Sequence, residues 1–269
     1  VPVRSWLAAN DTTALALYPC LAVYALYRED PEEDAGRALS CAERLSASEP
    51  DARAVLANLL ADAGWRQGVD TEQGGATFAQ ARELAQSARD ENPTSAKAWE
   101  ALARVAFFSG ELLAARDNLN SAYQLNPAST DTIAGYVQVL GHIGNWQSAM
   151  RLFDEIRAAE ADPPDWYYLA PALHALRMAD YPRAVDHARL ALPAYPDMSV
   201  AILVAAGGAM RDLSLINAYL PRLLAGQRYR RMGILPTLRH LISDTELLRQ
   251  FSMGISNAGV PLDRLTQPF

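Results

Sequence analysis

The sequence predicts an all-α protein, a right-handed solenoid of about five to six helical hairpins that ends in a helical cap. Two observations predict this fold. Small residues recur along the chain at a nearly constant distance, and prolines follow all but one of the first five at twelve residues. The recurring residues are Ala38, Ala81, Ala115, Ala149, Ala184 and Ala218, separated by 43, 34, 34, 35 and 34 residues. A fixed period of this length is typical of stacked repeats of one supersecondary unit.

The clearest repeat begins at Ala96 and shows what each residue type does. Counted from Ala96, Trp99 is at position four, Ala103 at eight, Gly110 at fifteen and Ala115 at twenty. Alanines at eight and twenty let two antiparallel helices approach closely, and larger residues fill the layer between repeats. The glycine permits a tight turn between the helices, and a proline closes the second helix. This arrangement is the tetratricopeptide pattern.

The other repeats follow from the same register. A single solenoid domain is predicted over 1–269, with repeats at about 11–50, 51–95, 96–129, 130–164, 165–198 and 199–233 and a cap at 234–269. The wide first spacing indicates an insertion at 68–76, "GVDTEQGGA", which two adjacent glycines and the lack of an apolar anchor predict to be a mobile surface loop. The cap is predicted to contain two closing helices, the second with Asp244 as its N-cap.

The stretch "DPPDWYY" interrupts the register by one residue. Pro163 and Pro164 end one hairpin, and Asp165 is expected to cap the next helix. Tyr168 then falls at position four in the core layer. Trp166 falls on the opposite face, where it is more open to a binding role.

Composition and motifs argue against several classes of function. The net charge of −7 and a pI of about 5.1 disfavour nucleic-acid binding, since phosphate backbones are repelled. The one basic stretch, "RYRRM" at 228–232, is expected to be a solvated face. The chain has no HExxH, GxSxG or Walker loop. We therefore expect a non-catalytic protein without metal or cofactor. The apolar run 14–27 is too short to span a membrane and contains Pro19.

Four stretches resemble one subset of tetratricopeptide proteins. They are the broken repeat over 57–103, "GNWQSAMRLFDEI" followed by "DPPDWYY", "MADYPRAVDHARLAL" and the ending "ISDTELLRQFSMGISNAGVP". Together they resemble the C-terminal region of bacterial class III adenylate cyclases and of winged-helix transcriptional regulators of the CadC kind. The resemblance implies a sensory or regulatory domain that controls an attached output domain. No cyclase or winged-helix motif is present here, and because the chain starts on Val1 we expect it to be part of a longer protein.

The alternative function is a free-standing scaffold that assembles other proteins. In either case the first helix of each hairpin should line a concave groove, through positions near two, five, nine, twelve and thirteen. The groove is predicted to take a protein or peptide partner, or a small anionic ligand. Its predicted lining residues are Lys97, Arg104, Phe108, Gln138, His142, Trp166, Leu173 and Arg177. The alternatives left open are a merely solvated groove and one filled by the chain's own N-terminal segment.

The two cysteines bear on the compartment. Cys20 and Cys41 lie at similar distances from a predicted turn near residue 30, so a disulfide is geometrically reachable. Two buried free thiols are the alternative. A disulfide would favour the periplasmic side of the bacterial inner membrane over the cytoplasm.

Overall fold

The computed structural model describes residues 23–24, 27–28 and 31–269, and these residues contain helices and no strand. This confirms the predicted all-α fold. The helices are α3 (Pro31–Leu45), α4 (Pro50–Gln67), α5 (Glu72–Glu91), α6 (Ala96–Phe108), α7 (Leu112–Leu125), α8 (Thr130–His142), α9 (Trp146–Ala159), the 3-10 turn η1 (Asp165–Tyr168), α10 (Leu169–Arg177), α11 (Tyr181–Ala191), α12 (Pro196–Met210), α13 (Leu213–Ala225), α14 (Gln227–Met232), α15 (Ile234–Leu241), α16 (Thr245–Asn257) and α17 (Leu262–Thr266).

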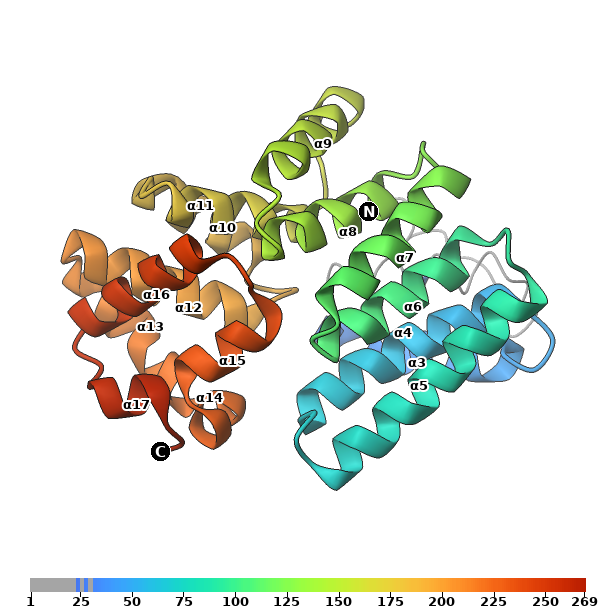
Figure 1. The fold of residues 1–269 in the computed structure, drawn as a ribbon, viewed down its shortest axis with the longest axis horizontal. Helices are drawn as coiled ribbons and strands as arrows, with labels where there is room; N and C mark the ends of the chain where they lie inside the picture. Colours follow the sequence, from blue (N-terminus) through green and yellow to red (C-terminus); the bar gives the residue numbers. More distant parts are fainter. Residues whose placement is uncertain (1–22, 25–26, 29–30) are drawn as a thin grey trace. The chain divides into compact units, whose positions relative to one another are not determined.

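The chain forms two compact units, of which unit 1 ends at Thr132 and unit 2 begins at Ile133. In unit 1, α4 pairs with α5 and α6 pairs with α7 as antiparallel hairpins, and the first helices α4 and α6 also pack on each other (Figure 1). In unit 2, α10 pairs with α11 and α12 pairs with α13. The last helices, α14 to α17, follow these hairpins, and α16 packs along α12. The sequence predicted one continuous domain, and each unit is a self-contained stack of hairpins.

Small residues hold the two helices of each hairpin together. Five of the six recurring alanines are at most 1% exposed, namely Ala38, Ala81, Ala115, Ala149 and Ala184. The sixth, Ala218, is exposed, and Ile216 is buried in its place, in contact distance of Gly207 on α12. The register of the last repeat is therefore shifted by two residues, and the prediction for Ala218 is wrong. The left-handed turn residue still precedes the buried residue by five, Arg211 before Ile216 as Ala179 before Ala184, so the repeat is shortened before the turn and not in it.

The turns inside the hairpins require a left-handed backbone. Gly110 and Gly144 have φ of 79° and 84°, as the pattern predicted for position fifteen. The next two hairpins make the same turn with Ala179 and Arg211, whose φ values are 58° and 56°. Residues with a Cβ pay a conformational cost in this region, so these two turns are held by the surrounding hairpin.

The predicted insertion at 68–76 is not a mobile loop over its whole length. Only residues 68–71 connect the helices, and α5 already begins at Glu72 with Thr71 as its N-cap, the side chain accepting from the backbone N–H of Gly74 at 3.0 Å. A Cβ on Gly74 would lie 1.9 Å from the carbonyl oxygen of Gly68. The added residues therefore lengthen both helices, and Gly74 allows the close approach to Gly68, whereas a Cβ on Gly75 would meet open space.

The aromatic stretch after the two prolines also differs from its prediction. Residues 165–168 form the 3-10 turn η1, and Asp165 makes no side-chain cap. Trp166 is buried against Tyr167, with ring centroids 4.4 Å apart. Tyr168 is half-buried and packs on Phe153, at 5.7 Å. Trp166 is therefore buried and not open to a binding role, whereas Tyr168 packs between Phe153 and the His187 ring, 5.2 Å away, as expected for the core layer.

Candidate functional site

In unit 1 the candidate site lies on α4 and α6, the first helices of two successive hairpins. Counted back from Gly68 as position fifteen, the predicted groove positions of α4 are Asn58 at five, Asp62 at nine, Trp65 at twelve and Arg66 at thirteen. The corresponding residues of α6 are Lys97, Glu100, Arg104, Phe107 and Phe108. We call this surface the first-helix face of unit 1.

Asp62 is the centre of this face. Its carboxylate accepts from the Tyr27 hydroxyl at 2.7 Å and from Arg104, through Nε at 2.7 Å and a terminal nitrogen at 2.6 Å. Arg66 in turn donates to the Tyr27 hydroxyl at 3.4 Å. Since the side chain of Asp62 is buried, these bonds compensate for removing its charge from water. The Asp62 carboxylate therefore connects Tyr27, which precedes α4, with Arg104 on α6.

Aromatic rings continue the face beside this ion pair. Trp65 stacks on Phe108 with ring centroids 5.1 Å apart, and the Arg104 guanidinium lies 5.2 Å from the Phe108 centroid. Trp65 is half-buried and Arg66 is exposed. Arg104 is therefore fixed both by a carboxylate and by a ring, and its guanidinium has a defined orientation.

A second ion pair lies one helical turn or more earlier on α6. The Lys97 ammonium contacts Glu100 at 2.9 Å, and Glu100 also accepts from the Thr132 hydroxyl. Burial favours the neutral amine, but the attraction of Glu100 and the hydrogen bond to it outweigh burial, so the pKa of Lys97 is raised. Lys97 is a cation at any physiological pH.

Two buried polar atoms of unit 1 have no hydrogen-bond partner among the residues that the structure describes. They are the hydroxyl oxygen of Tyr24 and Oδ1 of Asn58, whose residues are 4% and 2% exposed. Asn58 stands one turn before Asp62 on the same side of α4. Burial raises the pKa of Tyr24, and the charges that act on it are those of Arg28, Arg104, Asp62 and Lys97. Both atoms lie in the interior beside Asp62, out of reach of a ligand on the surface, and an unsatisfied buried polar group costs free energy.

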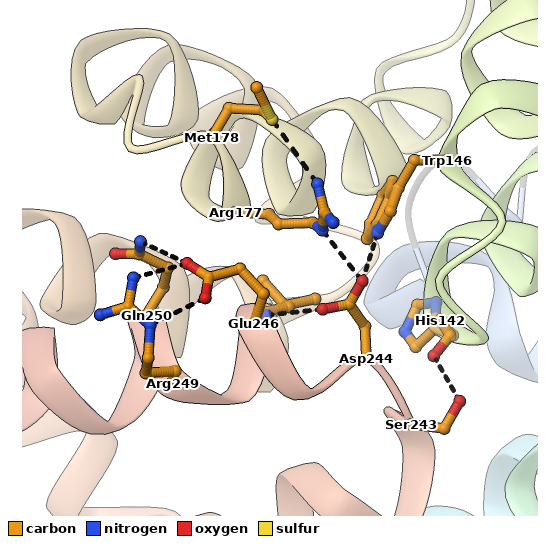
Figure 2. Close-up of polar contacts among 10 residues, drawn as sticks. His142, Trp146, Arg177, Met178, Ser243, Asp244, Glu246, Arg249 and Gln250 are labelled. Carbon is orange, nitrogen blue, oxygen red and sulfur yellow. Dashed lines mark hydrogen bonds and ion pairs between the residues drawn. The ribbon is translucent and has the colours of Figure 1, made fainter.

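In unit 2 the first helices of the hairpins are covered by another helix of the same chain. The C-terminal helix α16 packs on α12 and α10, as Figure 1 shows. Its N-cap, Asp244, accepts from the backbone N–H of Leu247 at 2.7 Å, from Trp146 Nε1 at 2.7 Å and from Arg177 Nε at 2.9 Å (Figure 2). The backbone N–H of Ser243 donates to the carbonyl of His142 at 2.9 Å. The predicted N-cap is confirmed, and two predicted groove residues contact the chain's own C-terminal segment.

Asp244 stays ionised in this cluster. Burial opposes ionisation, but the hydrogen bonds from Leu247, Trp146 and Arg177 outweigh it and lower the pKa of the Asp244 carboxyl. These hydrogen bonds connect the start of α16 to the turn after α8 and to the end of α10.

The body of α16 is held by apolar contacts and close backbone packing. Leu247, Phe251 and Ile255 are completely buried and stand at i, i+4 and i+8. At Gly254 a Cβ would lie 2.1 Å from the carbonyl oxygen of Ala205, so only glycine permits this approach to α12. The Tyr181 hydroxyl adds a hydrogen bond to Gln250 at 3.1 Å.

The eight predicted groove residues therefore fall into two groups. Lys97, Arg104 and Phe108 lie together in unit 1, where Arg104 and Phe108 are in contact. Of the five in unit 2, His142, Trp166 and Leu173 are buried, while Gln138 and Arg177 are half-buried. The buried side chains pack inside unit 2 and present no surface to a ligand in this structure, which corrects the expectation that they line an open groove.

Some residues of the two faces were not predicted. Asn58, Asp62, Trp65 and Arg66 could have been found by counting the register back through the insertion. The role of Asp244 beyond capping had no signal in the local sequence. Cys20 lies outside the described residues, so its pairing with Cys41 stays a prediction. In the basic stretch 228–232, Arg228 is buried and pairs with Asp197 at 2.7 Å, so that stretch is only partly a solvated face.

Comparisons with known proteins identify the repeat. Residues 109–173 match the family model of the tetratricopeptide repeat. No curated protein matches the chain. The fold is of the all-α tetratricopeptide-repeat type, and such repeats imply a scaffold for protein–protein interaction. Within the part of the chain that the structure describes, no helix is both long and apolar enough to cross a bilayer, and no group of acidic, His or Cys side chains is arranged to hold a metal ion.

Proposed function

We propose that this chain is a non-catalytic regulatory repeat domain whose first-helix face in unit 1 binds an extended segment of a partner protein. Occupancy of this face would control an attached output domain, either an adenylate cyclase or a DNA-binding transcriptional regulator, as the resemblance of the sequence implies. In such a protein the domain would lie on the periplasmic side of the bacterial inner membrane.

One observation carries the proposal, namely the half-buried Trp65 ring, which stacks on Phe108 and is followed by the exposed Arg66. The ring offers apolar contacts and the Arg66 guanidinium offers cationic contacts to the side chains of an extended segment.

A small anionic ligand is the other occupant to consider, since Arg66, Lys97 and Arg104 all lie on this face. Two of these cations already have carboxylate partners, Arg104 with Asp62 and Lys97 with Glu100. Internal neutralisation of this kind favours a peptide, whose side chains can also contact the Trp65 ring, over a free anion.

The test is selection of 12-residue peptides from a phage-displayed library on the purified chain, followed by affinity measurement on variants. Arg66→Ala removes an exposed cation from this face, so the fold should be little affected, while peptide affinity falls about 5- to 10-fold for one lost charge-assisted hydrogen bond. Arg116→Ala is the matched control, because Arg116 is on the second helix α7 and pairs only with its neighbour Asp117 among the ion pairs described.

Peptides that bind the wild-type chain and the Arg116→Ala variant equally, but bind Arg66→Ala more weakly, would support the proposal. Equal binding to all three proteins would place the peptide on another surface. The link to an output domain is tested separately: a cyclase or winged-helix domain encoded upstream in the same reading frame supports it, and a short leader alone supports the free-standing scaffold.

A further inference from the structure

We infer that the first-helix face of unit 2 is a binding site for an amphipathic helix, and that α16 is its ligand in cis. The inference rests on unit 2 alone and is independent of the peptide site proposed for unit 1. The seat of α16 is formed by α10, α12 and the end of α8, the same helices whose groove positions were expected to hold a partner.

The seat has two chemically distinct parts. At one end Trp146 Nε1 and Arg177 Nε both donate to one carboxylate oxygen of Asp244. Along the rest, the buried residues of α12 and α10 cover Leu247, Phe251 and Ile255. Figure 2 shows the polar end, with the Asp244 side chain directed at the Arg177 and Trp146 side chains.

These parts define the helix that the site recognises. It has an acidic N-cap, apolar residues three, seven and eleven positions after the cap, and a glycine ten positions after it for close approach to α12. The opposite side of α16 is polar and exposed, with Glu246 and Arg249 paired to each other at 2.6 Å. A helix of another protein with the same pattern would make the same contacts.

The covalent connection explains why α16 itself fills the site. A short tether gives a segment an effective concentration in the millimolar range, so a free helix of equal intrinsic affinity competes poorly. Weakening only the cis helix should reverse this preference, because the Trp146 and Arg177 donors then remain available to a helix that still carries the aspartate.

The test uses the full chain and a fluorescein-labelled peptide of residues 243–258, SDTELLRQFSMGISNA. We expect the Asp244→Ala chain to bind this peptide about 10- to 100-fold more tightly than the wild-type chain does, the change expected for losing a cap and a charge-assisted hydrogen bond in cis. Asp263→Asn is the matched control, since it removes one carboxylate from the exposed surface of α17, outside α16. It should behave as wild type, and a peptide carrying the same Asp244→Ala change should lose the gain.

Hydrogen exchange on the same proteins shows whether the Asp244→Ala change loosens α16 alone or α12 as well. In the Asp244→Ala chain, the amides of α16 should exchange faster while those of α12 keep their protection. Loss of protection in α16 and α12 together would mean that α16 is an inseparable part of the core and would overturn the inference. So would faster exchange of α16 without any gain in peptide binding.

Discussion

Acidification should destabilise unit 2 through His142. This side chain is 1% exposed, and its Nδ1–H donates to the carbonyl of Gln138 at 2.8 Å. Burial lowers the pKa of His142 from 6.5 to about 4, and the backbone hydrogen bond only partly opposes the shift. The unfolded chain therefore binds a proton more readily than the folded one, so the stability that this group contributes is complete above pH 6.5 and is lost as the pH falls towards 4.

The magnitude follows from the two pKa values. At pH 5 the unfolded histidine is almost fully protonated, about 1.5 pH units below its pKa, while the folded one is still mostly neutral. At about 1.36 kcal/mol per unit, the free energy of unfolding should fall by about 2 kcal/mol between pH 7.5 and pH 5. Burial also lowers the pKa values of His174 and His187, so part of the total pH dependence belongs to them.

Urea denaturation at the two pH values, compared between wild type and His142→Asn, isolates the contribution of His142. The variant should be less stable at pH 7.5 but should lose about 2 kcal/mol less on acidification. A proton NMR titration of the histidine ring measures the same quantity without relying on the variant. A folded-state pKa near 6.5, or equal pH dependence in the two proteins, would refute the reasoning.

Three further predictions concern the small residues of the hairpins. Gly144→Ala should lower the melting temperature and reduce the free energy of unfolding by about 1 kcal/mol or more, because its φ is 84° and a Cβ would meet the Asp244 carboxylate at 3.2 Å. Ala179→Gly should instead raise the free energy of unfolding by up to about 1 kcal/mol, because glycine adopts the same backbone conformation without strain. Ala115→Leu should cost about 1–3 kcal/mol in chemical denaturation, since the site is completely buried, whereas Ala218→Leu on the exposed side of α13 should change stability by less than about 0.5 kcal/mol. Limited proteolysis should leave the turn before α5 intact in wild type and cut there in Gly74→Ala, because a Cβ at Gly74 cannot fit 1.9 Å from a backbone carbonyl.

The repeat register was the most predictable part of this protein. A position that must be small because two helices touch leaves the same letter every 34 residues, and the alanines of five hairpins are buried as expected. The register failed at Ala218 because the repeat is shorter before its turn: Arg211 follows Ala179 by 32 residues, whereas Ala179 follows Gly144 by 35. Neither Ala179 nor Arg211 is a glycine, so the sequence does not mark where these two turns lie, and the shift is visible only in the structure.

The position of α16 was harder to foresee. Its ends, its cap and its apolar positions follow from the sequence, but the surface that it covers depends on tertiary packing. The small residues Ala205 and Gly208 on α12, Gly254 on α16 and Ala258 at its C-cap were the available signal. Two helices that each carry small residues one turn apart can approach closely, yet the sequence does not say which pairs of such helices meet.

The chemistry of the residues at the groove positions distinguishes the two faces. At position nine, unit 1 has Asp62 and Arg104, which pair with each other, whereas the η1–α10 repeat of unit 2 has Leu173. At positions five and twelve the same repeat has Leu169 and Leu176, both buried. An apolar stripe on the open side of a hairpin cannot stay in contact with water without a large cost, so it requires a cover. A polar, ion-paired face requires none and can remain open to a partner. The change from charged residues to leucines along one position of the repeat therefore distinguishes the face that α16 covers from the face for which we propose a partner.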